Sequence, residues 1–181
     1  MKLVENRKSL NKTFDQDGIT VYTTFEDAKM SSVVEVALVE GLSPMGNFNY
    51  FIENWATCAP KVNPLIIELK EMEPVDGVPI AYTIAKCPSP LNNRINFNAR
   101  YVRYDRQPGE ILFMLSEKGA ESRITTIDKN LVKAQLFVAG WQFIPVEDSC
   151  GEVIGTKIFY LQSADAGGNI PSFVQNMAGP N

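Results

Sequence analysis

Apolar residues recur at helical spacing in one stretch of this chain and alternate with polar residues in most of the others. Ser43 and Pro44 suit the N-cap and the first position of a helix. Large apolar residues then follow three or four positions apart, namely Met45, Phe48, Phe51, Ile52 and Trp55. We therefore expect one helix over Met45–Trp55, which ends before Pro60 because proline interrupts a helix.

Stretches rich in β-branched residues on both sides of this helix predict strands. We expect two strands before the helix, Ile19–Thr24 and Ser32–Glu40, and three hairpins after it. The hairpins join Leu65–Met72 to Ile80–Lys86, Arg94–Tyr104 to Glu110–Leu115, and Leu131–Val146 to Glu152–Gln162. Hairpins without intervening helices are antiparallel, since parallel pairs need a crossover of about a dozen residues or more. The pattern predicts one α+β domain over residues 1–181, with polar residues 1–18 and 117–130 outside the strands and a short helix from Pro171.

The predicted sheet carries more apolar surface than one helix covers. Ile111–Leu115 is apolar throughout, and Phe137, Trp141 and Phe143 recur mostly at period two. Either the sheet closes on itself and fills with side chains, or it leaves an apolar hollow for a ligand. Alternation along the strand that begins at Arg94 puts four polar side chains on one face, where they meet either water or the hollow: Arg94, Asn96, Asn98 and Arg100.

Composition excludes several kinds of site. The chain has 181 residues, a net charge of −4 and no histidine, which excludes a Ser-His-Asp triad, a histidine-ligated zinc and a histidine general base. Cys58, Cys87 and Cys150 form no C-x-x-C pair, so we expect no disulfide framework, no metal and no cofactor. The acidic balance argues against a nucleic-acid partner. A polar start and the lack of an apolar run of about 20 residues favour a cytoplasmic protein.

Two motifs follow one another in the second half of the chain. Residues 86–94 read Lys-Cys-Pro-Ser-Pro-Leu-Asn-Asn-Arg, and the strand Gly155–Tyr160 precedes Asp-Ala-Gly-Gly-Asn-Ile-Pro-Ser-Phe at residues 165–173. They resemble the Lys-x-Pro-x-Pro-x-Ser-Asn-Arg loop and the Asp-x-Gly-Gly-x-Ile-Pro segment of the START family, the steroidogenic acute regulatory protein-related lipid-transfer domains. The resemblance extends from about Gly18 to Met177. It implies a helix-grip fold, in which a curved antiparallel sheet and a C-terminal helix enclose one lipid, without catalysis or metal.

The resemblance also implies which residues meet the lipid. Arg100 matches an arginine that points into the family's cavity, but the acid that faces it in sterol-binding members falls at Ala81 here. Because a buried unpaired guanidinium is costly, we expect Arg100 to meet a lipid phosphate or an acid from elsewhere. The head-group positions of phosphatidylcholine and ceramide binders fall at about Ala59 and Asn63, where only the Asn63 amide can hydrogen-bond. The expected lipid-binding residues are Arg100, Asn63, Asn96, Asn98, Phe113, Trp141 and Phe173.

The proline-containing loop is expected to act as a gate beside the C-terminal helix and to touch membrane transiently. Its predicted residues are Pro88, Pro90, Leu91, Asn93 and Arg94. Leu91 is the one large apolar side chain at its tip, so docking by this loop alone would be weak; a connection without a role is the alternative. A helix from Pro171 that stops at Gly179-Pro180 is too short to cover the sheet. We expect a longer parent chain, a second subunit of a homo-oligomer or a membrane to cover the rest.

Three functions stay open at this point. The leading one is a binding module that carries one phospholipid or sterol-like lipid, because burial of acyl chains at about 0.8 kcal/mol per CH₂ gives ample affinity. The second is a small enzyme of the related polyketide cyclase type, which the lack of histidine and of a paired carboxylate motif disfavours. The third is a regulatory domain whose core is filled by its own side chains.

Overall fold

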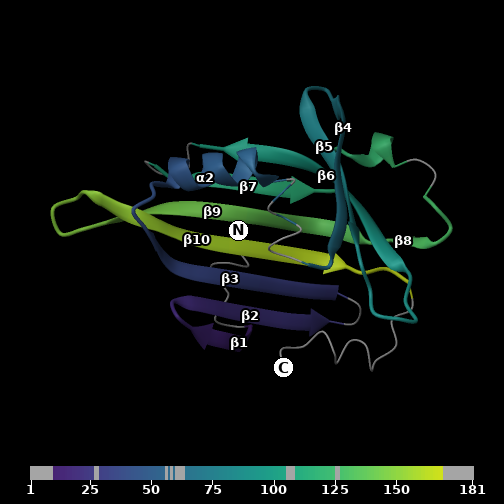
Figure 1. The fold of residues 1–181 in the computed structure, drawn as a ribbon, viewed down its shortest axis with the longest axis horizontal. Coiled ribbons are helices and arrows are strands. Elements are labelled where there is room, and N and C mark those ends of the chain that lie inside the picture. The colour runs from purple at the N-terminus through teal and green to yellow at the C-terminus, as the bar shows by residue number, and fades with distance from the viewer. Residues whose placement is uncertain are drawn as a thin grey trace.

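One curved sheet of ten strands carries a helix against one of its faces (Figure 1). The computed structural model describes residues 10–26, 29–55, 57, 59, 64–104, 109–124 and 127–168. The helix is α2 (Pro44–Glu53), and the strands are β1 (Asn11–Gln16), β2 (Ile19–Glu26), β3 (Lys29–Glu40), β4 (Ile66–Val75), β5 (Val78–Ala85), β6 (Asn93–Arg103), β7 (Ile111–Ser116), β8 (Leu131–Lys133), β9 (Gln135–Glu147) and β10 (Val153–Asp165). The strand order is β1-β2-β3-β10-β9-β7-β6-β5-β4, with β8 beside β6.

The three predicted hairpins are confirmed as β4–β5, β6–β7 and β9–β10, each antiparallel. Asp76 and Gly77 both have positive φ in the first turn, as a two-residue hairpin loop of the primed type requires. The prediction of one strand over Leu131–Val146 is wrong. The strand breaks at Ala134, whose N–H donates to the Ile95 carbonyl at 2.8 Å, and β8 before the break pairs in parallel with β6.

A strand also forms where the polar composition predicted none. Asp17 and Gly18, both at positive φ, turn the chain so that β1 folds back onto β2. Because β1 is an edge strand, polar side chains suit it, and Asp15 Oδ2 lies 2.5 Å from Lys12 Nζ. The contact with Lys12 holds the pKa of the Asp15 carboxyl below its usual value.

Helix α2 begins as predicted and ends earlier than predicted. Ser43 Oγ accepts a hydrogen bond from the Gly46 N–H at 3.2 Å, and Pro44 occupies the first turn. The helix stops at Glu53 because Asn54 turns its side chain back to donate to the Tyr50 carbonyl at 2.8 Å. Trp55, Thr57 and Ala59 are again helical, so the apolar stripe continues beyond the break.

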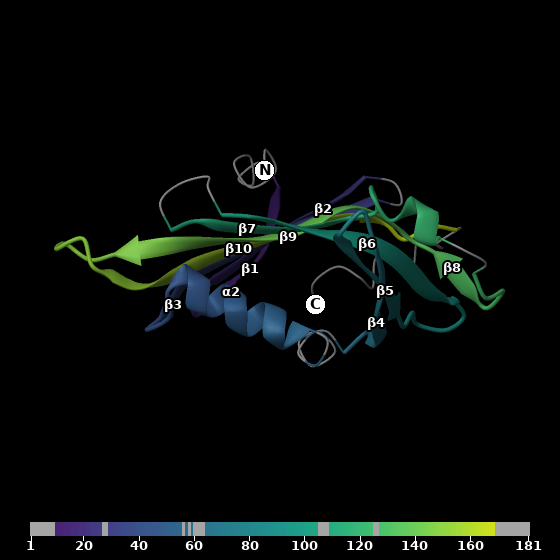
Figure 2. The same cartoon turned by 90° about the horizontal axis from the view of Figure 1, so that it is seen from above.

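The sheet has two unlike faces. We call the face against α2 the inner face; β4 and β5 curve toward the same side (Figure 2). On the outer face, Ile124 and Ile127, which follow the short 3₁₀ helix Glu121–Arg123, pack against a cluster of buried residues: Ile80, Ile95, Phe97, Ala99 and Ala120. A second outer cluster, Val33, Phe159 and Leu161, lies on β3 and β10.

Candidate functional site

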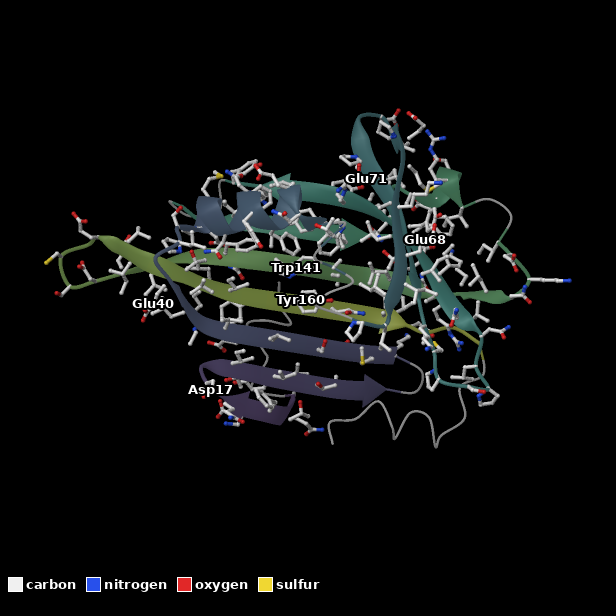
Figure 3. All side chains as sticks on the ribbon, viewed as in Figure 1. Asp17, Glu40, Glu68, Glu71, Trp141 and Tyr160 are labelled. Atoms are coloured by element: carbon white, nitrogen blue, oxygen red, sulfur yellow. The ribbon has the colours of Figure 1, made fainter. Side chains whose placement is uncertain are left out.

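Aromatic side chains fill the space between α2 and one half of the inner face. Phe51 of α2 has its ring centroid 5.7 Å from that of Phe113 and 4.8 Å from that of Trp141. Trp141 also stacks against Tyr160 of β10 with centroids 4.6 Å apart, and the two rings lie side by side in Figure 3. Phe113, an expected lipid contact, is 1% exposed beneath the helix, whereas Trp141 is only half-buried. This half of the face is packed with the protein's own side chains.

Tyr160 marks the border between this aromatic half and a polar half. Its hydroxyl donates to Gln162 Oε1, and burial raises the pKa of the Tyr160 phenol, so it stays neutral. Gln162 pairs with Ala139 and Arg100 pairs with Leu115, which in turn pairs with Ala139. Gln162 and Arg100 therefore stand in one row across the sheet, on the same face.

The polar row of β6 lies on the inner face. Val102, two residues after Arg100, pairs with Phe113, which lies beneath α2. The alternation expected from the sequence then places the polar residues of β6 on the side of the helix, not on the outer face. Asn98 is buried, and its Nδ2 donates to Asn96 Oδ1 at 3.1 Å. Thr83, which pairs with Asn96 across β5, is also buried.

Arg100 pairs with an acid that sequence reasoning missed. Its Nη2 lies 2.8 Å from Glu71 Oε1, on β4 (Glu71 is labelled in Figure 3). Glu71 pairs with Ala81, and Ala81 pairs with Asn98, so the acid stands one strand beyond the position expected at Ala81. The small Ala81 side chain leaves room for the guanidinium to pass over β5.

The two partners differ in exposure. The Arg100 side chain is 14% exposed, whereas that of Glu71 is 62% exposed. A pair with one partner in water contributes about 0–1 kcal/mol to stability. Arg100 Nε is buried and has no hydrogen-bond partner among the described residues. The guanidinium therefore keeps a donor on the inner face that none of the described residues uses.

Arg94, which was expected in the gate, is buried, and its guanidinium hydrogen-bonds to backbone carbonyls. Its Nε donates to the Ala166 carbonyl at 3.0 Å and its Nη2 to the Gly167 carbonyl at 3.2 Å. Its Nη1 donates to the Asn92 carbonyl. Arg94 thus connects the start of β6 to the segment that follows β10, and each of its three side-chain nitrogens donates to a backbone carbonyl.

The proline-containing loop is held by its own ends. Asn93 Oδ1 accepts from the Cys87 N–H at 3.2 Å, and the Leu91 N–H donates to the Pro88 carbonyl at 3.0 Å. The Ser89–Pro90 peptide bond is cis, and both prolines are exposed. Leu91 is half-buried, so its side chain is not fully presented to solvent.

Backbone geometry explains the Asp-Ala-Gly-Gly motif at residues 165–168. Asp165 Oδ1 accepts from the Gly167 N–H at 2.8 Å, and Gly167 and Gly168 both have positive φ, of 67° and 69°. A Cβ at Gly167 would lie 2.2 Å from the Lys133 carbonyl oxygen of β8. Only glycine fits this close approach.

Other expected sites fall outside the described residues or have no candidate within them. Asn63, Phe173, Cys58 and the helix from Pro171 lie outside the described residues. Cys87 and Cys150 are not in disulfides. In the described part of the chain, no group of three or more Cys, Asp or Glu side chains is placed to hold a metal ion. None of the described helices is long and apolar enough to cross a membrane.

Comparison with known proteins identifies the fold. No sequence model of a known family matches the chain, and no curated protein sequence matches it. The crystal structure of human STARD10 matches with a TM-score of 0.64 and 20% identity, over 93% of this chain and 66% of that chain. A STAR-related lipid transfer protein from Xanthomonas axonopodis matches with a TM-score of 0.66 and 19% identity, over 93% and 88%. The chain has the fold of a START domain.

A third START structure supports the same assignment. The human StarD13 (DLC2) lipid transfer and protein localization domain matches with a TM-score of 0.62 and 11% identity, over 99% of this chain and 90% of that one. At such identities the match concerns the START fold alone. Within it, this chain combines an aromatic half under α2 with a polar half on β4–β6, where Arg100, Asn98, Asn96 and Thr83 lie near one another on the inner face.

Proposed function

We propose that this chain binds one lipid on the inner face and carries it between membranes, without catalysing a reaction. Two of the similar START structures are described as lipid transfer proteins or domains, which supports the proposal. The observation that carries it is Arg100, a largely buried cation on the inner face whose Nε donor has no partner in the described part of the chain. A buried donor without an acceptor costs the folded state free energy. A ligand that brings an acceptor to Arg100 Nε would remove this cost, which is why the donor supports a binding function.

The polar half of the inner face is the proposed head-group end. A guanidinium has five N–H donors and binds a phosphate through two parallel hydrogen bonds. Glu71 occupies one edge of Arg100 in the structure, and because its side chain is mostly in water it can move away at little cost. The Asn96 and Asn98 amides and the Thr83 hydroxyl supply further hydrogen bonds to a phosphodiester or to the glycerol beside it.

The apolar part of the lipid is proposed to lie along the half-buried aromatic side chains. Trp141 and Tyr160 adjoin the polar row, whereas Phe113 is sealed beneath α2 and supports them from below. Burial contributes about 0.8 kcal/mol for each CH₂ group removed from water. Phospholipid is therefore the favoured ligand, because it offers both a phosphate and long apolar chains.

The remainder of the proposal concerns residues beyond those described. One domain spans residues 1–181, and the helix from Pro171 closes over the lipid in a helix grip, with Phe173 against the chains and the Asn63 amide near the head group. The loop with Pro88, Pro90, Leu91 and Asn93 opens and closes beside this helix during transient contact with a membrane in the cytoplasm. A second copy of the chain covers any part of the inner face left open.

Lipid extraction with native mass spectrometry, followed by transfer of fluorescent phosphatidylcholine between vesicles, tests the proposal. We expect one phospholipid per chain, and about 30-fold weaker binding in Arg100→Ala, equivalent to about 2 kcal/mol. Lys70→Ala is the matched control, since Lys70 is an exposed cation on β4 that pairs with Tyr82 on the outer face. Cholesterol, which has no phosphate, should be less sensitive to Arg100. If no lipid is extracted from the purified protein, and Arg100→Ala and Lys70→Ala bind added phosphatidylcholine equally, a regulatory domain with a filled core is favoured instead.

A further inference from the structure

A β-bulge near the turn of the β4–β5 hairpin decides which residue of β4 faces Arg100. Two residues of β4, Glu73 and Pro74, lie opposite one residue of β5, Pro79. An extra residue on one strand reverses the faces of the side chains beyond it. Because of the bulge Glu71 faces inward, whereas in the register without it Glu71 would point to the outer face. The bulge therefore creates the contact between Glu71 and Arg100.

The ladder of backbone hydrogen bonds between β4 and β5 is interrupted at this bulge. Pro74 and Pro79 both lack a backbone N–H, so neither strand donates through these residues. Side chains on the outer face support the bulge instead. Met72 and Val75, on the two sides of the bulge, both pack against the outer-face cluster that contains Ile80. Residues three apart on a regular strand face opposite sides, so this packing and the bulge depend on each other.

Arg123 supplies a hydrogen-bond donor at the bulge. Its Nη2 donates to the Pro74 carbonyl at 3.1 Å, from the 3₁₀ helix that lies beside the β4–β5 hairpin (Figure 1). Among the described residues this carbonyl is the one acceptor of the Arg123 guanidinium, whose Nε is buried without a partner there. Arg123 and Pro74 are 49 residues apart in the chain. The bond therefore joins the segment after β7 to the edge strand of the sheet.

The backbone that carries Arg123 is itself held in place. Ala120 is 0% exposed within the same outer-face cluster, and its carbonyl accepts a hydrogen bond from the Arg123 N–H at 2.9 Å. The Tyr101 hydroxyl of β6 donates to the Lys118 carbonyl at 3.0 Å. Gly119 comes so close to this tyrosine that a Cβ there would lie 2.3 Å from the hydroxyl oxygen. Arg123 is therefore presented to the bulge from a fixed backbone.

We propose that Arg123 is a positioning residue for the inner face: it stabilises the bulge of β4 and so keeps Glu71 against Arg100 until a ligand displaces it. The inference rests on the proposed function, in which Glu71 occupies the guanidinium before lipid arrives. A residue on the outer side of the sheet thus sets how strongly Glu71 competes with a lipid phosphate. Loss of one hydrogen bond shifts a local equilibrium about threefold or more, so Arg123→Ala should free Arg100 to that extent.

Nuclear magnetic resonance of the lipid-free protein tests the positioning of Glu71. A cross-strand proton contact between Glu71 and Ala81 reports the bulged register, and we expect it to weaken in Arg123→Ala. Arg123→Lys should restore the contact, because an ammonium also donates to a carbonyl. Lys129→Ala, which removes an exposed cation from the same loop, is the matched control and should behave as wild type. A contact that is equally strong in wild type and Arg123→Ala would overturn the proposal.

Titration of the same variants with phosphatidylcholine vesicles separates positioning from a merely structural role. Arg123→Ala should bind about threefold more tightly than wild type, whereas structural damage would weaken binding. In the Glu71→Gln background Arg123→Ala should add nothing, because the competing carboxylate is already gone. Unchanged or weaker binding in Arg123→Ala, or further tightening in the double variant, would overturn the proposal. If no variant binds lipid while the Glu71–Ala81 contact weakens as expected, the positioning role is supported and only the proposed function fails.

Discussion

Arg94 and Ala166 stand 72 residues apart in the chain, and the Arg94 Nε–H donates to the Ala166 carbonyl oxygen at 3.0 Å. With the bonds to Gly167 and Asn92, one guanidinium fastens the start of β6 to the exit of β10. The proline-containing loop ends directly before Arg94, and the segment toward the C-terminus begins directly after Gly167. The two elements proposed to admit the lipid therefore share one anchor.

Arg94→Lys is expected to destabilise the fold by about 2 kcal/mol, since a lysine ammonium keeps the charge but cannot match the fork that reaches three carbonyls. Urea denaturation measures the change. Arg103→Lys is the control, because Arg103 is exposed on the same strand. Equal losses in the two variants would contradict a special role for Arg94.

Gly167→Ala is expected to cost at least about 3 kcal/mol, because strain at positive φ adds to the contact with the Lys133 carbonyl. Gly151→Ala is the matched control: Gly151 also has positive φ, but a Cβ there meets nothing within 4 Å, so only about 1 kcal/mol should be lost. Thermal unfolding of both proteins checks the difference. A cost at Gly167 no larger than at Gly151 would mean that β8 moves aside freely.

Glu71→Gln is expected to tighten phospholipid binding several-fold, because the carboxylate competes with the lipid phosphate for Arg100. Stability should change by less than about 1 kcal/mol, since Glu71 is largely in water. Titration with vesicles of phosphatidylcholine measures the affinity, with Glu73→Gln as a control on the same strand. Weaker binding in Glu71→Gln would instead assign Glu71 a direct contact with the lipid.

Stability is expected to fall above about pH 10, the ordinary pKa of tyrosine. Burial raises the pKa of Tyr160 in the folded state, so the unfolded chain loses its phenol proton first and each further pH unit favours unfolding by up to about 1.4 kcal/mol. The contribution is fully present below pH 10. Tyr160→Phe should flatten the decline between pH 10 and 11, at a cost of about 1 kcal/mol at neutral pH from the lost bond to Gln162. Urea denaturation at each pH measures the free energy of unfolding. If this free energy falls with pH as steeply in Tyr160→Phe as in wild type, the Tyr160 phenol is exposed to water.

The helix and the hairpins could be predicted because their signals are local. Ser43-Pro44 begins the helix, and Asp76-Gly77 forms the turn between β4 and β5, as both dipeptides suggest. The inner-facing polar row of β6 also followed from alternation, but only contacts with α2 decide which face is inner. Those contacts are between residues distant in sequence, so no local pattern contains them.

The Arg100–Glu71 pair could not be predicted because the register of β4 slips. Counted back from the Asp76-Gly77 turn without a bulge, Glu71 would pair with Tyr82 and face outward. The structure has a register shift between Met72 and Val75, and Glu71 pairs with Ala81 instead. A slip of one residue reverses the face of every side chain beyond it. Pro74, inside the shifted segment, is the one signal of a bulge in the sequence.

The place of β10 between β3 and β9 has a consequence for how the chain folds during synthesis. Ser31 and Ser163, whose hydroxyls lie 2.9 Å apart across the β3–β10 pair, are 132 residues apart in the chain. β1, β2 and β3 are translated early and can form a meander, yet one edge of β3 stays unpaired until β10 has left the ribosome. That edge includes Val33, Val34 and Val36, a β-branched run of the kind that pairs readily with other chains. Closing so long a loop is slow, so this edge of β3 is open to pairing with other chains until β10 has been made and has paired with it.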